Sequence, residues 1–430
     1  MKLLVIGSGG REHAIVWKAS QSEKVKNIFV IPGNPGIAQE NKVILSDIKN
    51  PSISKYVQFA KDNEIDLTIV GPEAPLVDGI VDEFEKNNLV IFGPNKLASQ
   101  LEGSKDFCKN ILNSGNILTA KHQTFTDSIS AINYINQQTM PIVIKADGLA
   151  AGKGVFILSS KEECYKLIND LFTGKIDGIK TSKIIIEEFL KGEEASFICL
   201  VSGKHVIPLA SSKDHKKLND GDHGPNTGGM GAYSPTKLID DDLSNTVINK
   251  IIVPTINELK NKGIEYQGFL YAGLMIDKNK KPYVLEYNCR LGDPEAQAIL
   301  MRLESDIVDI FLGAINKNLE DLNNIRWKRE SACTIVLASS GYPGNYEKNK
   351  KIEGLSDEID GIKIFHSGTK LEGGNLVTNG GRVLAVTALG INLQVAQAKA
   401  YDRCNNIFWG GKIKRNDIAE KEIRNKFIFS

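Results

Sequence analysis

The chain has 430 residues, enough for two or three domains with large cores. Its 53 Lys and Arg against 52 Asp and Glu give a net charge of +1, so we expect no nucleic-acid partner. No apolar run approaches the ~18 residues that span a bilayer, and Met1 leads directly into a strand-like run instead of a signal peptide, so we expect no membrane contact. The six cysteines are scattered without a CxxC pair, which is typical of reduced thiols in a cytoplasmic protein.

Short apolar runs alternate with helix-like segments through the first hundred residues. We expect a helix over 12–20, and strands over 3–6, 27–31, 67–70 and 89–92. The expected strands end at Gly or Pro, and open α/β sheets bind ligands at the carboxyl ends of their strands. The pattern predicts an open parallel α/β domain over residues 1–103.

The remainder divides into a central region, 104–325, and a small C-terminal α+β domain, 326–430. In the central region we expect a helix over 104–114, and strands over 141–145, 183–190, 269–276 and 283–287, the last two forming a hairpin. The polar stretch 211–234 has little to bury, so it is predicted to be a mobile loop or an active-site loop.

A glycine-rich loop follows the first expected strand. Gly9, Gly10 and Arg11 precede a helix, where backbone N–H groups attract an anion. The dinucleotide fingerprint fails, because Glu12 replaces its last glycine and the second strand ends at Ile31 without an acid. A phosphate or sugar phosphate fits better than a nicotinamide, and a tight turn without a ligand is the alternative.

A second glycine-rich loop, 148–154, follows a strand that ends at Lys145. Its spacing differs from that of a P-loop, but it can fold over phosphates, with Lys145 or Lys153 opposing their charge. The alternative is a hairpin with solvated lysines. On a later strand, Glu187 and Glu188 would be costly to bury unless an adenine amino group, ribose hydroxyls or a cation binds them, and the alternative is a solvated strand edge.

The segment 285–297 is the most informative. The period of a strand places Glu286, Asn288 and Arg290 on one face. Two oxygen ligands followed by a guanidinium suit a phosphoryl site bridged by Mg²⁺. A structural Glu–Arg ion pair is the alternative.

Together these segments resemble the ATP-grasp superfamily, and over the whole chain they resemble the phosphoribosylamine–glycine ligase family of de novo purine synthesis. The resemblance is carried by residues 5–14, 71–76, 144–155, 187–190, 224–235, 288–295 and 378–383. It implies a fold with an N-terminal parallel α/β domain, a two-lobed ATP-grasp core whose small lobe is about 122–190, and a small C-terminal α+β domain.

The resemblance also implies an ATP site and a metal site. Glu286 and Asn288 would hold Mg²⁺ or Mn²⁺, and the number of metal ions stays open because the preceding strand offers no acid before Asp277. The residues implied to contact ATP are Lys105, Lys145, Gly152, Lys153, Gly154, Glu187, Glu188, Phe189, Leu190 and Glu194.

The implied reaction joins glycine to 5-phosphoribosylamine through a glycyl phosphate, with ATP converted to ADP and phosphate. We assign Arg290 to the glycine carboxylate and the oxyanion, and either Asp293 or Asp214 to the glycine ammonium. Asn226 is expected to shield the acyl phosphate from water. The residues expected to hold phosphoribosylamine are Gly9, Gly10, Arg11, Glu73, Lys370, Gly381 and Arg382.

Three other functions compete with this one. A second ATP-grasp ligase, with a different carboxylate and amine, is disfavoured by the match along the whole chain. A nucleotide sensor without turnover is disfavoured by the set Lys145, Glu286, Asn288 and Arg290, and a nicotinamide oxidoreductase by Glu12. We expect a monomer that makes transient contact with the enzyme supplying phosphoribosylamine.

Overall fold

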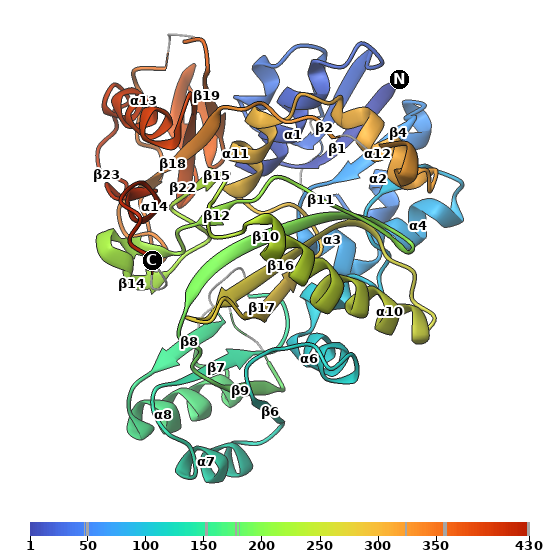
Figure 1. Cartoon of the computed structure of the whole chain (residues 1–430). Helices are drawn as coiled ribbons and strands as arrows, with labels where there is room; N and C mark the ends of the chain where they lie inside the picture. Colours follow the sequence, from blue (N-terminus) through green and yellow to red (C-terminus); the bar gives the residue numbers. More distant parts are fainter. Residues whose placement is uncertain are drawn as a thin grey trace.

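The computed structural model describes residues 1–46, 48, 51–150, 154–176, 179, 181–322, 325–355 and 359–427. Three regions surround a central sheet (Figure 1). The N-terminal and C-terminal regions lie at one end of the molecule, and a small lobe projects from the other. In the described part of the chain, no helix is both long and apolar enough to cross a bilayer.

The N-terminal region is a parallel sheet with helices, as predicted. Its strand order is β3 (Val43–Leu45), β2 (Asn27–Pro32), β1 (Lys2–Gly7), β4 (Leu67–Val70), β5 (Ile91–Phe92). Its helices are α1 (Gly10–Ser20), α2 (Ile53–Asp62), α3 (Glu73–Asp78) and α4 (Ile80–Lys86). The last strand is only two residues long, shorter than the predicted 89–92, because Leu89 already closes the turn after α4 by donating its N–H to the Phe84 carbonyl.

The small lobe is an antiparallel sheet with two helices. Its strand order is β6 (His122–Phe125), β9 (Ile184–Glu188), β7 (Ile142–Ala146), β8 (Val155–Leu158). Its helices α7 (Ser128–Asn136) and α8 (Lys161–Phe172) share a hydrophobic cluster with the sheet. Both begin at a capping side chain, Asp127 for α7 and Ser160 for α8, which accepts a backbone N–H of the first turn.

The central sheet is also antiparallel. Its strand order is β11 (His205–Pro208), β10 (Glu193–Ser202), β16 (Gln267–Ile276), β17 (Pro282–Asn288), and the predicted hairpin is its β16–β17 pair. The helices around it are α5 (Gln100–Gly103), α6 (Lys105–Ser114), α9 (Asp241–Val247) and α10 (Val253–Asn261). A bulge in β17 leaves Leu285 unpaired, since Gly273 lies opposite Glu286 and Leu274 opposite Val284.

The C-terminal region contains strands from the middle of the chain. The sheet order is β12 (Lys213–Asp214), β15 (Gly231–Ser234), β18 (Ser331–Ser339), β22 (Arg382–Gly390), β19 (Ile362–His366), and β23 (Lys412–Ile413) pairs with β18. The stretch 211–234, predicted to be a mobile loop or an active-site loop, contains four strands. It contributes two strands to this sheet and a separate hairpin, β13 (Lys217–Asn219) and β14 (His223–Asn226).

The other C-terminal elements are short or lie on the surface of this sheet. They are α13 (Leu393–Asn405), α14 (Glu420–Ile423) and the hairpin β20 (Thr369–Glu372) with β21 (Asn375–Thr378). Because the central and C-terminal regions share a sheet, their position relative to each other is fixed by backbone hydrogen bonds. The predicted boundary at residue 325 stays a prediction.

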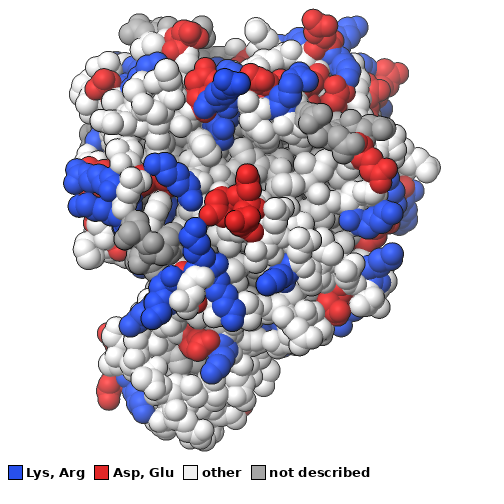
Figure 2. Space-filling view, viewed as in Figure 1, with Lys and Arg blue, Asp and Glu red and all other residues white. Residues whose placement is uncertain are grey.

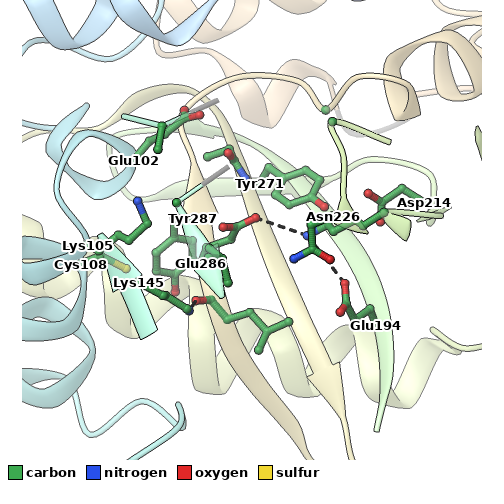
Figure 3. Close-up of a pocket in the computed structure, with 18 of the residues that line it drawn as sticks. Glu102, Lys105, Cys108, Lys145, Glu194, Asp214, Asn226, Tyr271, Glu286 and Tyr287 are labelled. Atoms are coloured by element: carbon green, nitrogen blue, oxygen red, sulfur yellow. Dashed lines mark hydrogen bonds and ion pairs between the residues drawn. The ribbon is translucent and has the colours of Figure 1, made fainter. Parts of the chain in front are cut away.

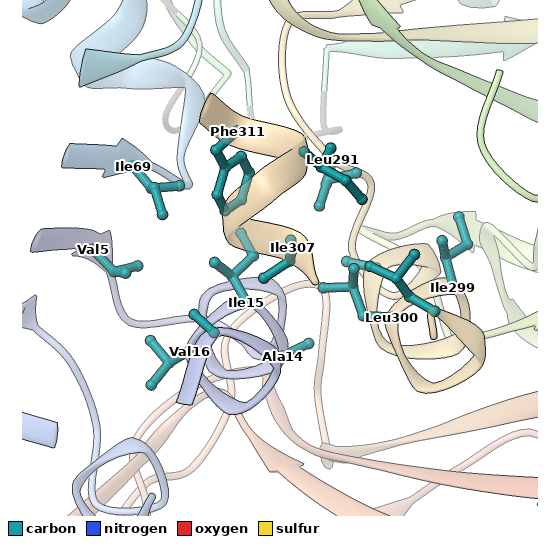
Figure 4. Packing of buried hydrophobic residues seen from close by; sticks show 14 of the residues in the cluster. Val5, Ala14, Ile15, Val16, Ile69, Leu291, Ile299, Leu300, Ile307 and Phe311 are labelled. Carbon is teal, nitrogen blue, oxygen red and sulfur yellow. The ribbon is translucent and has the colours of Figure 1, made fainter. Parts of the chain in front are cut away.

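One hydrophobic cluster joins the N-terminal, central and C-terminal regions. Ile15 on α1, Leu300 on α11 (Glu295–Arg302) and Phe311 on α12 (Ile307–Ile315) belong to it, together with residues from three sheets (Figure 4). Burial of this apolar surface stabilises the three regions as one body. The small lobe has a cluster of its own and does not take part.

Candidate active site

A cavity of about 420 Å³ lies where the small lobe, the central sheet and the 214–228 segment meet. Most predicted site residues line it. They are Arg11, Glu73, Lys105, Lys145, Gly154, Glu187, Glu188, Phe189, Leu190, Glu194, Asp214, Asn226, Glu286, Asn288, Arg290, Asp293 and Arg382. The structure does not bring Gly9, Gly10, Lys370 or Gly381 to the cavity lining. Gly152 and Lys153 lie outside the described residues.

One wall of the cavity is basic. Lys105, the first residue of α6, donates from Nζ to the Gly148 carbonyl at 2.8 Å, and Lys145, near the end of β7, donates to the Leu285 carbonyl at 2.9 Å. Figure 3 shows both lysines on one side of Glu286, with Asp214 and Glu194 on the other. Burial lowers the pKa of Lys105. The two ammonium groups therefore place positive charge beside the second glycine loop.

Glu187 is buried beneath this wall and is only 2% exposed. It lies on β9, an interior strand of the small lobe, so the solvated-edge alternative is wrong for this residue. Its Oε1 lies 3.0 Å from Lys145 Nζ and 3.2 Å from Lys109 Nζ. Burial opposes its ionisation, but the two ammonium groups outweigh burial and lower its pKa. Two lysines supply the counter-charge of this carboxylate.

The neighbouring residue Glu188 is exposed, and its Oε1 accepts the backbone N–H of Lys121 at 2.9 Å. Its side chain faces away from the buried Glu187 because successive strand residues alternate. Together with Phe189 and Leu190 it places the β9 backbone end at the cavity. This segment can contact a nucleotide through main-chain groups and apolar surface.

Glu286 lies on β17 with its carboxylate in the cavity (Figure 3). Lys216 Nζ lies 3.3 Å from Glu286 Oε1 and 3.7 Å from Glu194 Oε2. The charge of Lys216, and then those of Lys145 and Lys105, lower the pKa of Glu286 to about 2 against the opposing effect of burial. Glu286 is therefore ionised at neutral pH.

Asp214 faces the same space and behaves differently. Burial, with the nearby charge of Glu295, raises the pKa of Asp214 to about 8. The pKa values of two carboxyl groups in one cavity are thus shifted in opposite directions. Such a separation is typical of sites that move charge and protons.

Asn288 and Glu286 offer two hard oxygen ligands on one face of β17. Among the described residues no group of three or more His, Cys, Asp and Glu forms a protein-only metal cage. A site with one carboxylate and one amide oxygen suits a divalent cation that also binds phosphate oxygens. The residues present therefore fit the predicted metal, provided that the substrate completes its coordination.

Arg290, expected to hold the glycine carboxylate and the oxyanion, already contacts several neighbouring residues. Its Nη2 donates to Glu102 Oε1 at 2.7 Å and to Asn288 Oδ1 at 3.0 Å, and its Nη1 donates to the Leu291 carbonyl. Its Nε lies 3.3 Å from a carboxylate oxygen of Glu73. Hydrogen bonds therefore use three of its five N–H groups, and its Nε, beside Glu73, has no hydrogen-bond partner among the described residues. The Nε hydrogen and one Nη1 hydrogen remain for a substrate.

The first glycine loop, which was expected to bind a phosphate, forms a hydrogen bond with a side chain of its own helix. Gly9 N–H donates to Glu12 Oε2 at 2.6 Å, so the first glycine loop encloses a carboxylate of its own helix. The same carboxylate lies against Gly71. A Cβ at that position would lie 2.2 Å from Glu12 Oε1, so a larger residue would not fit there. Glu12, which breaks the dinucleotide fingerprint, thus takes the place of an external anion at Gly9.

Arg382 and Asp293 meet at the junction with the C-terminal region. Arg382 Nη2 lies 3.3 Å from Asp293 Oδ2, and its Nη1 donates to the Gly228 carbonyl at 2.7 Å. Arg11 Nη1 donates to the Leu291 carbonyl at 3.1 Å from the N-terminal side. By contrast, Lys370 lies on β20, where its ammonium pairs with Glu372 at 2.9 Å. The two arginines remain candidates for the substrate phosphate.

Several lining residues escaped the sequence analysis, namely Glu102, Lys109, Lys216, Lys217, Tyr271 and Glu295. Lys216 and Lys217 carry a weak signal, as two adjacent lysines in an otherwise polar stretch. Glu102 and Lys109 lie on short helices, and only their distant partners Arg290 and Glu187 reveal them. Figure 2 shows Lys and Arg side chains gathered where the small lobe meets the rest of the molecule, with acidic side chains beside them.

Comparison with known proteins gives the same assignment along the whole chain. Three domain models described as phosphoribosylglycinamide synthetase match it, the N domain over residues 1–102, the ATP-grasp (A) domain over 103–296 and the C domain over 332–421. The phosphoribosylamine–glycine ligase of Vibrio vulnificus (strain YJ016) is 51% identical over 424 residues, which cover 98% of this chain and 99% of that protein.

Two solved structures have the same fold as this chain. The crystal structure of phosphoribosylamine–glycine ligase from Thermotoga maritima superposes with a TM-score of 0.84 at 33% identity, over 97% of this chain and 100% of that one. A biotin carboxylase domain from Hydrogenobacter thermophilus, crystallised with magnesium ADP, shares the fold at a TM-score of 0.74 and 15% identity, covering 100% of this chain and 98% of that one. The chain therefore belongs to the phosphoribosylglycinamide synthetase family of ATP-grasp ligases.

Proposed function

We propose that this chain joins glycine to 5-phosphoribosylamine in the cavity described above, with ATP converted to ADP and phosphate. The product is glycinamide ribonucleotide, a step of de novo purine synthesis. The observation that carries the proposal is one cavity lined by Glu286, Asn288, Lys105 and Lys145, with both lysines on one side of Glu286 (Figure 3). An acid, an amide and two cations around one space are what phosphoryl transfer from a nucleotide requires.

The first step moves the γ-phosphoryl group onto a glycine carboxylate oxygen and releases ADP. Free carboxylate is a poor electrophile, and glycyl phosphate makes its carbon reactive. Lys105 and Lys145 oppose the charge of the phosphates on one wall, and Lys216 and Lys217 line the other. Holding the reactants in line supplies roughly 7–11 kcal/mol of the lowered barrier in favourable cases. The main-chain end of β9, at Glu188–Leu190, holds the adenosine end.

Glu286 and Asn288 would hold the divalent cation, Mg²⁺ or Mn²⁺. When bound, the cation supplies charge neutralisation at the phosphate oxygens. Glu286 is ionised at neutral pH, and Arg290 fixes the Asn288 amide by donating to its Oδ1. Glu187 is a positioning residue because it touches Lys145 and Lys109 and is 2% exposed.

The second step is attack of the phosphoribosylamine nitrogen on the acyl carbon, with loss of phosphate. Arg290 has its Nε hydrogen and one Nη1 hydrogen for the glycine carboxylate or the oxyanion, and Asp293 or Asp214 takes the glycine ammonium. Arg11 and Arg382 hold the phosphate of the amine substrate, and Glu73 meets its ribose. Asn226, with the adjoining 227–229 segment, shields the acyl phosphate from water.

Further parts of the proposal concern the cellular setting. We infer a cytoplasmic monomer that meets the enzyme supplying phosphoribosylamine only transiently. Support for a reducing compartment comes from the six cysteines, all buried and none in a disulfide. The near-zero net charge supports small-molecule substrates over a nucleic acid.

A substrate-omission assay tests the proposal. ADP release is measured with ATP and a divalent cation while glycine or phosphoribosylamine is withheld in turn, and the product mass is determined. We expect full turnover only with both substrates, slow turnover with glycine alone, and the mass of glycinamide ribonucleotide. Equal turnover with another amino acid, or rapid ADP release without glycine, would contradict it.

A further inference from the structure

The hairpin β13–β14 carries residues of the cavity at its open end. Lys217 on β13 pairs with Asn226 on β14, and both line the cavity. The neighbouring Thr227 donates its backbone N–H to the Lys216 carbonyl at 2.7 Å. These strands pair only with each other among the described strands. Since an isolated two-stranded hairpin is marginally stable, something outside it must hold Lys217 and Asn226 in place.

The turn of this hairpin is docked on the last segment of the chain. Arg415, only 1% exposed, is among the most deeply buried large side chains of the molecule. Its Nη1 donates to Asp222 Oδ1 at 2.8 Å and to the Lys217 carbonyl at 3.1 Å. Its Nε and Nη2 each donate to a carboxylate oxygen of Asp417 at 2.7 Å. One guanidinium therefore binds the turn, the base of β13 and its own segment.

Further contacts join the hairpin turn to the last segment of the chain. Gly221 N–H donates to Asp417 Oδ2 at 2.8 Å, and Asn416 N–H donates to Asp220 Oδ1 at 2.7 Å. Lys421 Nζ lies 2.9 Å from Asp222 Oδ2. We call this set of contacts between residues 220–222 and 415–421 the C-terminal latch.

The ion pairs of the C-terminal latch favour one fixed position of the hairpin turn on the terminal segment. Asp222 has its pKa lowered well below the usual range, because the charges and hydrogen bonds of Lys421 and Arg415 outweigh its partial burial. The bidentate pairing of Arg415 with Asp417 adds geometric specificity that a lysine would not give. The hairpin itself contributes little apolar surface, since Asn219 and His223 at its turn end are exposed.

We propose that Arg415 is a positioning residue of the ligase. It acts through the backbone of Lys217 to hold Lys217 and Asn226 against the phosphates of the nucleotide, from nearly two hundred residues further along the chain. The inference rests on the proposed function, since it takes the cavity to be the ATP site. It gives the C-terminal region a part in nucleotide binding, separate from the proposed contact of Arg382 with the amine substrate.

The test compares Arg415→Gln with Arg424→Gln as a matched control. Arg424 lies in the same terminal segment, is exposed and pairs only with Glu420 at 3.3 Å among the contacts of the described residues. We expect Arg415→Gln to raise the KM for ATP and the Kd for ADP by about 10-fold, the scale of one lost charge-assisted contact. The KM for glycine should change less than about twofold. Unchanged ADP affinity would overturn the proposal.

A double-mutant cycle separates positioning from a general loss of structure. If Arg415 acts through Lys217, adding Arg415→Gln to the Lys217→Gln variant should weaken ADP binding by less than about twofold further. Losses that multiply would overturn the proposal. If Arg415→Gln yields too little folded protein, Asp222→Asn can be used instead, because it removes the turn end of the latch and leaves the Arg415–Asp417 pair. We expect Asp222→Asn to raise the Kd for ADP about threefold or more. An unchanged Kd would count against the latch.

The assay also distinguishes the two proposals. Wild type and Arg424→Gln report whether glycine and phosphoribosylamine are joined at all. Absence of that reaction, with ADP still bound, would refute the proposed substrates and leave the latch testable by ADP affinity. Normal ligation with an unaltered ADP Kd in Arg415→Gln would refute the latch alone.

Discussion

Lys145 Nζ lies 3.0 Å from Glu187 Oε1, and both side chains are buried beneath the cavity. The same oxygen lies 3.2 Å from Lys109 Nζ, so one carboxylate contacts two ammonium groups. Lys145 is thereby held with its Nζ against the Leu285 carbonyl, at the bulge of β17 beside Glu286. This ion pair links the small lobe to the strand that carries the proposed metal ligands.

Replacing Glu187 by Gln should be strongly destabilising, because it leaves two buried lysines without their counter-charge. We expect the free energy of unfolding to fall by about 3–5 kcal/mol, the range for breaking one side of a buried ion pair. Urea denaturation monitored by circular dichroism measures this. Glu188→Gln, next to it on the exposed face of β9, is the control and should lower stability by less than about 1 kcal/mol. Equal effects of the two variants would contradict the buried pairing.

Glu286→Gln removes a carboxylate charge from the proposed metal site while keeping an oxygen ligand. We expect kcat to fall by at least ~10²-fold, the scale of losing one charge-stabilising contact in a transition state. Steady-state ADP release under saturating substrates is the measurement. Glu372→Gln on β20, outside the cavity lining, should leave kcat unchanged. Near-normal turnover of Glu286→Gln would place the cation elsewhere.

Arg382→Ala tests the proposed phosphate contact of the amine substrate. Arg382 lines the cavity, and its guanidinium joins β22 to Gly228 and Asp293. We expect the KM for phosphoribosylamine to rise about 10-fold, which corresponds to ~1.4 kcal/mol, with the KM for ATP unchanged. Lys370→Ala is the comparison and should have little effect, since Lys370 does not line the cavity. The reverse pattern, with ATP affected and phosphoribosylamine not, would refute this assignment.

The pKa of Asp214 predicts a pH dependence of stability. Its folded value of about 8 lies above the ordinary value of ~3.9 for Asp, because of burial and of Glu295. Between pH ~4 and about 8 the folded state keeps a proton that the unfolded state has released, so this group lowers stability as pH rises through the window.

Asp214→Asn removes that titration. We therefore expect the Tm of this variant, relative to wild type, to increase from pH 4.5 to pH 8 by a few degrees. Differential scanning calorimetry at four or five pH values measures the trend, with the exposed Asp402→Asn as control. A Tm difference that is constant over this range would show that Asp214 titrates near its ordinary value.

The sequence predicted the parts of this site that follow local periodicity. Glu286, Asn288 and Arg290 all line the cavity, as the period of a strand requires. The direction of the Arg290 guanidinium was not predictable, because Glu102, nearly two hundred residues earlier, determines it. Lys216 was missed for the same reason, since it enters the cavity only because β12 and β15 join the C-terminal sheet. Long-range pairing of polar segments leaves no periodic pattern in the chain.

The first glycine loop illustrates the other limit. Its residues were read as an anion site, and the loop does surround an anionic group. That group is Glu12 of the following helix, at 2.6 Å from the Gly9 nitrogen. Motif and spacing identify a site for negative charge, but only the packed structure shows that the chain itself fills it.

Isotope transfer shows whether this cavity converts glycine to glycyl phosphate. Glycine labelled with ¹⁸O in its carboxylate is supplied with ATP and phosphoribosylamine, and the released phosphate is analysed by mass spectrometry. We expect one ¹⁸O atom in the phosphate for each product molecule formed. Product formation with unlabelled phosphate would contradict it.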